Sequence, residues 1–188
     1  MKSVLTALAL FIAAGATFAG PLETATLLRE TQYAGWKYGP SAAKQEVDCV
    51  QFVASVVQKE IGRDLTPDER NAIYINPPPA DLSAAVESEQ PATKGIQYAL
   101  VDVLKRGIAV APEQAQPGDF IQYWIRKKDG KWAGHSAIIS RVFEIDGTRR
   151  IAIYGSHKIT GGIADTDFGG QGVKLTGADR KVYIARLQ

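Results

Sequence analysis

Cysteine and histidine are scarce in this 188-residue chain, which contains one cysteine, Cys49, and two histidines, His135 and His157. A single cysteine excludes any disulfide within the chain, so the fold has to be held together by other interactions. A lone thiol is either a small buried apolar group or a reactive one. The sequence around Cys49 therefore has to distinguish a buried, inert cysteine from a reactive one.

Long hydrophobic runs are also absent. The apolar run from Val4 to Ala14 has about 11 residues, whereas a membrane-spanning helix needs roughly 20. This run follows Lys2 and ends in small residues up to Ala19, which is the layout of a secretory signal peptide over 1–19. We therefore expect cleavage after Ala19, a periplasmic or secreted protein, and no membrane span.

Neither sign of charge is in strong excess. Lysine and arginine number 22 against 20 acidic residues, which gives a formal net charge of +2, and no basic run is longer than Arg126 to Lys128. This pattern argues against nucleic acid as a partner. Hydrophobic residues make up 45% of the chain, enough for one sizeable core. We expect 20–188 to form a single, monomeric domain.

Helical patterns dominate the first part of this domain. Asp48 stands where a helix N-cap belongs, and from Cys49 onward apolar residues recur every three or four positions until Gly62. The proline-rich segment 63–91 is interpreted as an irregular surface excursion. The expected helices cover 23–34, 49–61 and 92–106.

The second part changes to the two-residue period of strands. Asp129-Gly130 and Asp146-Gly147 are turn sequences between apolar runs, and they indicate consecutive antiparallel hairpins. The expected strands cover 120–125, 132–143, 149–154 and 181–187. Helices followed by a sheet predict the α+β class, with N-terminal helices packed on an antiparallel sheet.

The position of Cys49 in a first helical turn favours the reactive interpretation. The partial positive charge at a helix N-terminus lowers the pKa of a thiol, and the thiolate is the nucleophilic form. A nucleophile also needs a proton acceptor, and His135 lies at the start of a strand, directly after Gly134. A cysteine at a helix tip with a histidine on a strand across it forms the Cys-His pair of acyl-transfer enzymes.

Three motifs together resemble the papain-like cell-wall hydrolases, namely the NlpC-type peptidases and the related CHAP amidases. They are Asp48-Cys49-Val50-Gln51-Phe52-Val53, Gln116-Pro117-Gly118-Asp119-Phe120 and Gly134-His135-Ser136-Ala137-Ile138-Ile139, preceded by an aromatic, glycine-framed loop at 35–40. The chain differs from the NlpC pattern at Val50-Gln51, where that pattern has serine and glycine. It also has a long span between Cys49 and Pro117.

The resemblance implies a papain-like fold and hydrolysis of amide bonds in peptidoglycan peptides. Cys49 would be the nucleophile and His135 the base, without a metal or another cofactor. In some NlpC-type enzymes the counterpart of Asp48 binds a free amine of the peptide, which makes Asp48 a candidate for substrate binding; helix capping alone also explains this residue, and we favour capping slightly. Tyr38, in the loop before the nucleophile, is a candidate for the cleft wall or for the core.

The residue that orients His135 is left open by the sequence. In the family it is a polar residue on the next strand, and His157 and Ser156 are the candidates. A two-residue turn at Asp146-Gly147 places Ser156 on the face of His135, whereas one bulge or one added loop residue places His157 there, because side chains alternate along a strand. We favour His157.

Two functions other than hydrolysis fit the same residues. A papain-like scaffold can hold cell-wall fragments without cleaving them, as a binding module. The same Cys-His pair can also pass an acyl group to an acceptor other than water, as in an acyltransferase, or serve in an antibacterial amidase effector. The expected function is an exported cysteine peptidase or amidase.

Overall fold

The computed structural model describes residues 20–188, so the predicted signal peptide lies outside the described residues. The helices of this part are α1 (Pro21–Glu30), α2 (Cys49–Ile61), α3 (Pro67–Tyr74), α4 (Leu82–Glu87) and α5 (Ile96–Tyr98). The strands are β1 (Lys37–Tyr38), β2 (Glu46–Val47), β3 (Gly107–Val110), β4 (Phe120–Arg126), β5 (Trp132–Ile145), β6 (Thr148–His157), β7 (Gly162–Thr166), β8 (Val173–Lys174) and β9 (Arg180–Leu187). The α+β class is confirmed. None of these helices has the length and apolarity needed to cross a membrane.

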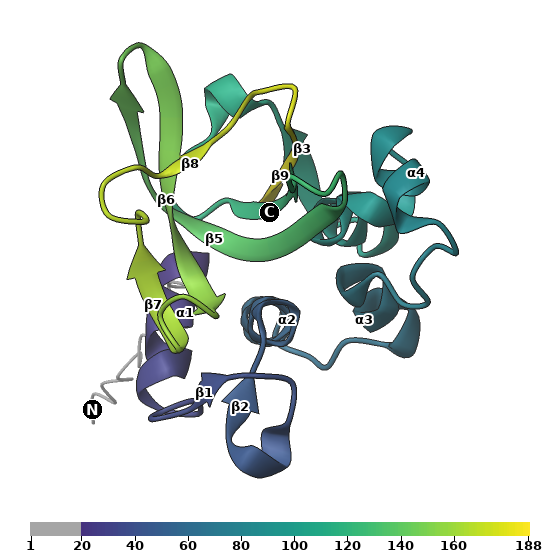
Figure 1. Cartoon of the computed structure of the whole chain (residues 1–188). Coiled ribbons are helices and arrows are strands. Elements are labelled where there is room, and N and C mark those ends of the chain that lie inside the picture. Colours follow the sequence, from purple (N-terminus) through teal and green to yellow (C-terminus); the bar gives the residue numbers. More distant parts are fainter. Residues whose placement is uncertain (1–19) are drawn as a thin grey trace, which may run out of the picture.

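A single nine-stranded sheet organises the described residues, in the order β2-β1-β7-β6-β5-β4-β9-β3, with β8 paired to β6 (Figure 1). The strand pairs from β3 through β9 are antiparallel, as the hairpin pattern predicts. The short β1 and β2 are parallel to each other, so the sheet is mixed rather than purely antiparallel. Strand β2 leads directly into α2, which places the start of that helix beside the sheet.

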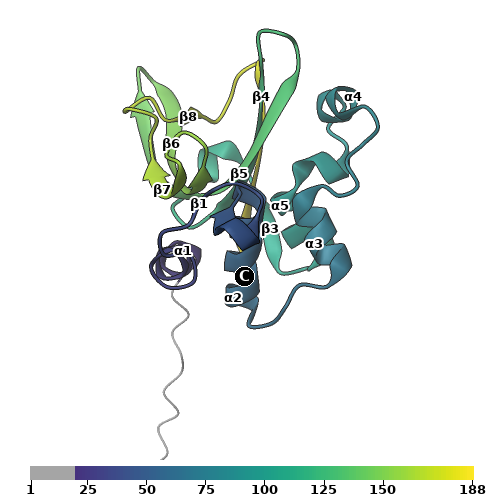
Figure 2. The same cartoon turned by 60° about the horizontal axis from the view of Figure 1, so that its bottom comes forward.

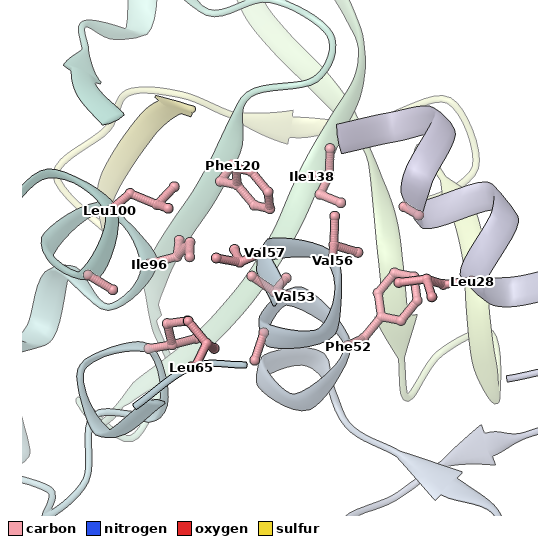
Figure 3. Packing of buried hydrophobic residues seen from close by; sticks show 14 of the residues in the cluster. Leu28, Phe52, Val53, Val56, Val57, Leu65, Ile96, Leu100, Phe120 and Ile138 are labelled. Atoms are coloured by element: carbon pink, nitrogen blue, oxygen red, sulfur yellow. The ribbon is translucent and has the colours of Figure 1, made fainter. Parts of the chain in front are cut away.

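Helix α2 is the centre of the core. It lies beneath β5, with α1 on one side and α3 on the other (Figures 1 and 2). Val53, Val56 and Val57 are fully buried and point toward Phe120 of β4 and Ile138 of β5 (Figure 3). Each fully buried side chain of this size contributes roughly 1.5–3 kcal/mol by leaving water. This burial holds the first turn of α2 in a defined place.

The β5–β6 hairpin begins as the turn sequence predicts. Asp146 and Gly147 both have positive φ, as a two-residue turn that follows the strand twist requires, and Ile145 pairs with Thr148. The register then shifts by one residue between Ile139 and Arg141, where β5 contains a bulge. Both strands extend beyond their predicted ends.

The segment 63–91 contains regular structure, so its interpretation as an irregular excursion is wrong. Thr66 caps α3 by accepting a hydrogen bond from the backbone of Glu69, whose carboxylate in turn accepts one from the Thr66 N–H. Pro67 fits the first helical position because its missing N–H has no intrahelical role there. Asp81 caps α4 in the same way, by accepting from the Ala84 N–H. The residues Asn76 to Pro79 between the two helices are indeed non-helical.

Other predicted boundaries also need correction. The expected helix at 92–106 is divided, because Gly95 has φ 50° and ψ −117°; a 3₁₀ turn (Pro91–Lys94) precedes it, and α5 and a π-helical turn (Ala99–Val103) follow. The first helix runs over Pro21–Glu30 rather than 23–34. Gly107 begins β3, which was not predicted, and β7 lies in a glycine-rich stretch.

Candidate active site

Cys49 is the first residue of α2 and is partly exposed. The helix start is held by a reciprocal capping box. Asp48 Oδ1 accepts a hydrogen bond from the Gln51 N–H at 2.9 Å, and Gln51 Oε1 accepts one from the Asp48 N–H at 3.0 Å. Gln51 Nε2 also donates to the carbonyl oxygen of Pro40 at 3.1 Å, which ties the helix start to the aromatic loop. Gln51, where the chain departs from the NlpC pattern, therefore positions Cys49.

The thiol of Cys49 lies against the strand that carries His135. The backbone N–H of Ser136, the residue after His135, acts to lower the pKa of the Cys49 thiol, and Ser136 lines the same cavity as Cys49. Cys49 and His135 also line one cavity of about 230 Å³. Gly134 is needed here, since a Cβ atom at this position would lie 2.6 Å from the ring of Trp124 on the neighbouring strand. The structure thus brings together the two residues predicted to form a catalytic pair.

His157 is the hydrogen-bond partner of His135. The distance from His135 Nε2 to His157 Nδ1 is 2.8 Å, and the ring centroids are 4.9 Å apart. The bulge in β5 explains this contact, because it shifts the register by one residue and turns His157 toward His135. Of the two registers that the sequence left open, the structure has the one that favours His157.

The hydrogen bonds of the two histidines define their tautomers. His157 Nε2 lies 3.2 Å from the carbonyl oxygen of Ala164, which can only accept, so Nε2 carries the proton. In a neutral ring, His157 Nδ1 is then an acceptor, and His135 Nε2–H must donate to it. The remaining nitrogen, His135 Nδ1, is left unprotonated. The pair is therefore arranged so that His135 can accept a proton at Nδ1.

Ser156, the alternative orienting residue, has a different role. Its Oγ donates a 2.6 Å hydrogen bond to the carbonyl oxygen of Val47, in the strand that leads into α2. Both residues are buried. The β5–β6 ladder ends at Ile138 and Tyr154, so this bond links β6 to the start of α2 beyond the last ladder pair. Ser156 thus anchors the segment that carries Cys49 and does not orient His135.

Tyr123 is a neighbour of the site that the sequence interpretation missed. It pairs with His135 across β4 and β5, and the ring centroids are 5.6 Å apart. Burial first, and then the nearby Cys49, raise the pKa of its hydroxyl. The turn sequence Asp129-Gly130 could not reveal this neighbour, because a two-residue turn there would pair Tyr123 with Ser136, whereas the loop is one residue longer and pairs Tyr123 with His135.

The pKa shifts of Cys49 and His135 disfavour a preformed ion pair of thiolate and imidazolium. Burial raises the pKa of Cys49, and this effect exceeds the lowering by the N–H groups of Ser136 and Val50. Burial and the adjacent His157 lower the pKa of His135 to about 3. The N–H groups at the helix start do lower the thiol pKa, as expected, but desolvation of the thiolate outweighs them, so the net shift is upward rather than toward neutral pH. At neutral pH the resting pair is a thiol beside a neutral imidazole.

Asp48 and Tyr38 both lie close to Cys49. Capping engages Asp48 Oδ1, as described, and burial raises the pKa of this carboxyl group. Burial also raises the pKa of Tyr38, with further contributions from the charges of Cys49 and Asp48. Neither Tyr38 nor Asp48 is among the residues that line the cavity shared by Cys49 and His135. Tyr38 is half-buried in β1 and belongs to the border of the site rather than to the core.

The histidine pair should make the fold sensitive to mild acid. His135 and His157 both have a pKa below the ordinary value of 6.5, so the unfolded chain takes up protons that the folded chain excludes. Stability is then complete above about pH 6.5 and declines as the pH falls toward the folded values. We expect His135 to account for a loss of about 2 kcal/mol between about pH 7.5 and pH 5. Urea unfolding at both pH values measures this loss. An equally large loss in a His135→Asn/His157→Asn variant would contradict the assignment.

The hypothesis of a Cys49-His135 catalytic pair predicts that removal of the His157 ring impairs catalysis without removing the base. For His157→Ala we expect kcat to fall about 10²-fold with little change in KM, since His135 loses the acceptor that orients it. His157→Asn should recover part of the rate, because its amide oxygen can accept from His135 Nε2. Steady-state kinetics on a soluble muropeptide, the substrate class that the sequence resemblance implies, make this comparison. Equal rates for the alanine and asparagine variants would rule out the orienting role.

Comparison with known proteins does not extend these observations. No protein-family model, no curated protein and no solved structure matches this chain. The functional interpretation therefore depends on the geometry of the site itself.

Proposed function

We propose that this protein is an exported cysteine hydrolase of papain-like fold that cleaves amide bonds in peptidoglycan peptides. The observation that carries the proposal is the hydrogen-bonded series from Ala164 through His157 to His135, in a cavity shared with Cys49. Nucleophile, base and orienting group are the three parts that covalent acyl transfer requires.

The proposed reaction begins with attack of Cys49 Sγ on the carbonyl carbon of the substrate, while His135 Nδ1 takes the thiol proton. His157 stabilises the resulting imidazolium through its hydrogen bond to His135 Nε2. The backbone N–H of Cys49 lies in the first helical turn, where it has no intrahelical acceptor and can stabilise the oxyanion. His135 then protonates the leaving amine, and water hydrolyses the thioester.

The cell-wall substrate is supported by two features. The signal sequence would place the protein outside the cytoplasm, where peptidoglycan is found. Asp48 and Tyr38 lie near the nucleophile, and the Asp48 carboxylate supplies a negative charge there that is suited to bind the free amine of a peptide.

Mass spectrometry of purified muropeptides after incubation with the protein tests the proposal. We expect a mass gain of one water, distributed over two fragments that identify the cleaved amide. Transfer of the acyl group to an added amine, without hydrolysis, would indicate an acyltransferase. Intact muropeptides at high protein concentration would contradict both activities.

A cell-wall-binding module is the second candidate, and the raised pKa of Cys49 is the observation that favours it. Thiol labelling separates the two candidates. An enzyme should react with iodoacetamide at neutral pH at a rate that falls in His135→Ala. In a binding module, Cys49 should not react with iodoacetamide. The unchanged protein and the His135→Ala variant should then both bind muropeptides on an affinity column.

A further inference from the structure

The cavity beside Cys49 extends from the nucleophile to the segment between α3 and α4. Apart from Cys49 and His135, its walls are mainly apolar: Val50, Tyr74, Ile75, Pro78, Leu82 and Trp124. Gln122, Gly134 and Ser136 complete the lining. None of these residues is an aspartate, glutamate, lysine or arginine.

The charge and size of this cavity restrict its occupant. A carboxylate or an ammonium group placed here would lose its hydration without gaining an ion pair. At about 230 Å³, the cavity is smaller than the roughly 300–1,000 Å³ that enclose a drug-sized ligand. It therefore suits one side chain or a short acyl group rather than a whole oligosaccharide.

Backbone conformation at Ile75 is a second, independent observation. This residue ends α3 with φ 55° and ψ 54°, in the left-handed region where glycine or asparagine is usual and a β-branched residue is rare. Its side chain lines the cavity and packs on the buried cluster of Val86, Trp124, Trp132 and Tyr183. An isoleucine held in this conformation supplies an apolar wall that glycine would not.

We propose that this cavity is the substrate subsite for an uncharged apolar group, an aliphatic or aromatic side chain adjacent to the scissile amide. The inference deepens the proposed function and rests on it, because Cys49 has to be the reacting group. It makes the segment 74–82 the determinant of specificity, and it excludes the charged side chains of a peptide from this position.

Alkylation of Cys49 tests the subsite without requiring amide cleavage. The chain has a single cysteine, so every thiol adduct reports on this site. In each reaction the Cys49 sulfur forms a bond to the methylene carbon of the reagent, iodide leaves, and the thiol proton passes to His135 or to solvent. Iodoacetamide, N-benzyl iodoacetamide and iodoacetate differ in the group presented to the cavity. Their rates are divided by those of N-acetylcysteine, which removes intrinsic reactivity.

We expect the corrected rate for the benzyl reagent to exceed that of iodoacetamide by about tenfold, since burial of the ring adds apolar binding. Iodoacetate should be the slowest of the three. Leu82→Asp introduces a charge at the first position of α4, where an acidic residue suits the helix, and it should abolish the benzyl preference. Leu27→Asp changes an exposed leucine on α1, away from the cavity, and should retain it.

Ile75→Gly is a second variant that guards against a folding defect. Glycine relieves the left-handed strain while removing the wall, so the benzyl preference should fall, and the relieved strain offsets part of the packing that the variant loses against the buried cluster. A reactive Cys49 with no benzyl preference, or with the same preference in Leu82→Asp, overturns the subsite alone. A Cys49 that no reagent modifies overturns the proposed function together with the subsite.

Discussion

Cys49→Ala is expected to lower kcat/KM for muropeptide hydrolysis by at least about 10⁴-fold, because loss of a covalent nucleophile removes the reaction pathway and leaves only weak residual catalysis. The fold should persist. Cys49 is partly exposed, and alanine is the residue that helices tolerate best. The quantity to measure is the rate at which new amino groups appear in purified muropeptides.

Two comparisons make this result specific to the thiol. Cys49→Ser retains the shape of the site but replaces the thiol with a far weaker nucleophile, so it should be nearly as inactive as alanine. Val50→Ala changes the next residue of α2 and should retain measurable activity, because Val50 lines the cavity without reacting. Full activity in Cys49→Ala would end the hydrolase proposal.

The largest expected effect on stability concerns Arg186 rather than the site. Asp119, from the Pro-Gly-Asp turn, accepts hydrogen bonds from Arg186 Nε at 2.7 Å and Nη2 at 3.0 Å. The Asp119 side chain is 1% exposed, and that of Arg186 is 31% exposed. We expect Arg186→Met to reduce the free energy of unfolding by about 3–5 kcal/mol, because it leaves a buried carboxylate without its charged partner. Urea unfolding at neutral pH provides the measurement.

Comparison of the stability losses in three single variants tests whether the buried charge of Asp119 is the cause. Asp119→Asn should destabilise less than Arg186→Met, since it removes the buried charge and leaves an arginine that can reach water. Arg141→Met breaks a pair with Asp167 in which the arginine side chain is 59% exposed, and it should change stability little. Similar losses for Arg186→Met and Arg141→Met would show that burial of Asp119 is not the cause.

Local rules in the sequence were sufficient for the position of the nucleophile. Asp48 at the N-cap, the valine repeat and Gly62 at the C-cap predict α2, and the structure has α2 at Cys49–Ile61. These signals depend on contacts within three or four residues, which any single chain contains. The same is true of the turn at Asp146-Gly147.

A local capping rule also predicts a helix in the segment 63–91. Thr66 and Glu69 form a capping box around Pro67, and this pattern indicates a helix start even in a proline-rich stretch. These helices matter for function as well as for the fold, because α3 and α4 supply much of the apolar wall beside Cys49.

The sequence by itself determined that Cys49 begins a helix and that His135 lies on a strand after a glycine. Only the tertiary structure decided which residue faces His135, because one bulge in β5 changes the face of every side chain beyond it. Only the tertiary structure showed the direction of the Cys49 pKa. A helix start lowers that value wherever it occurs, whereas the opposing desolvation depends on what the rest of the chain packs around the thiol.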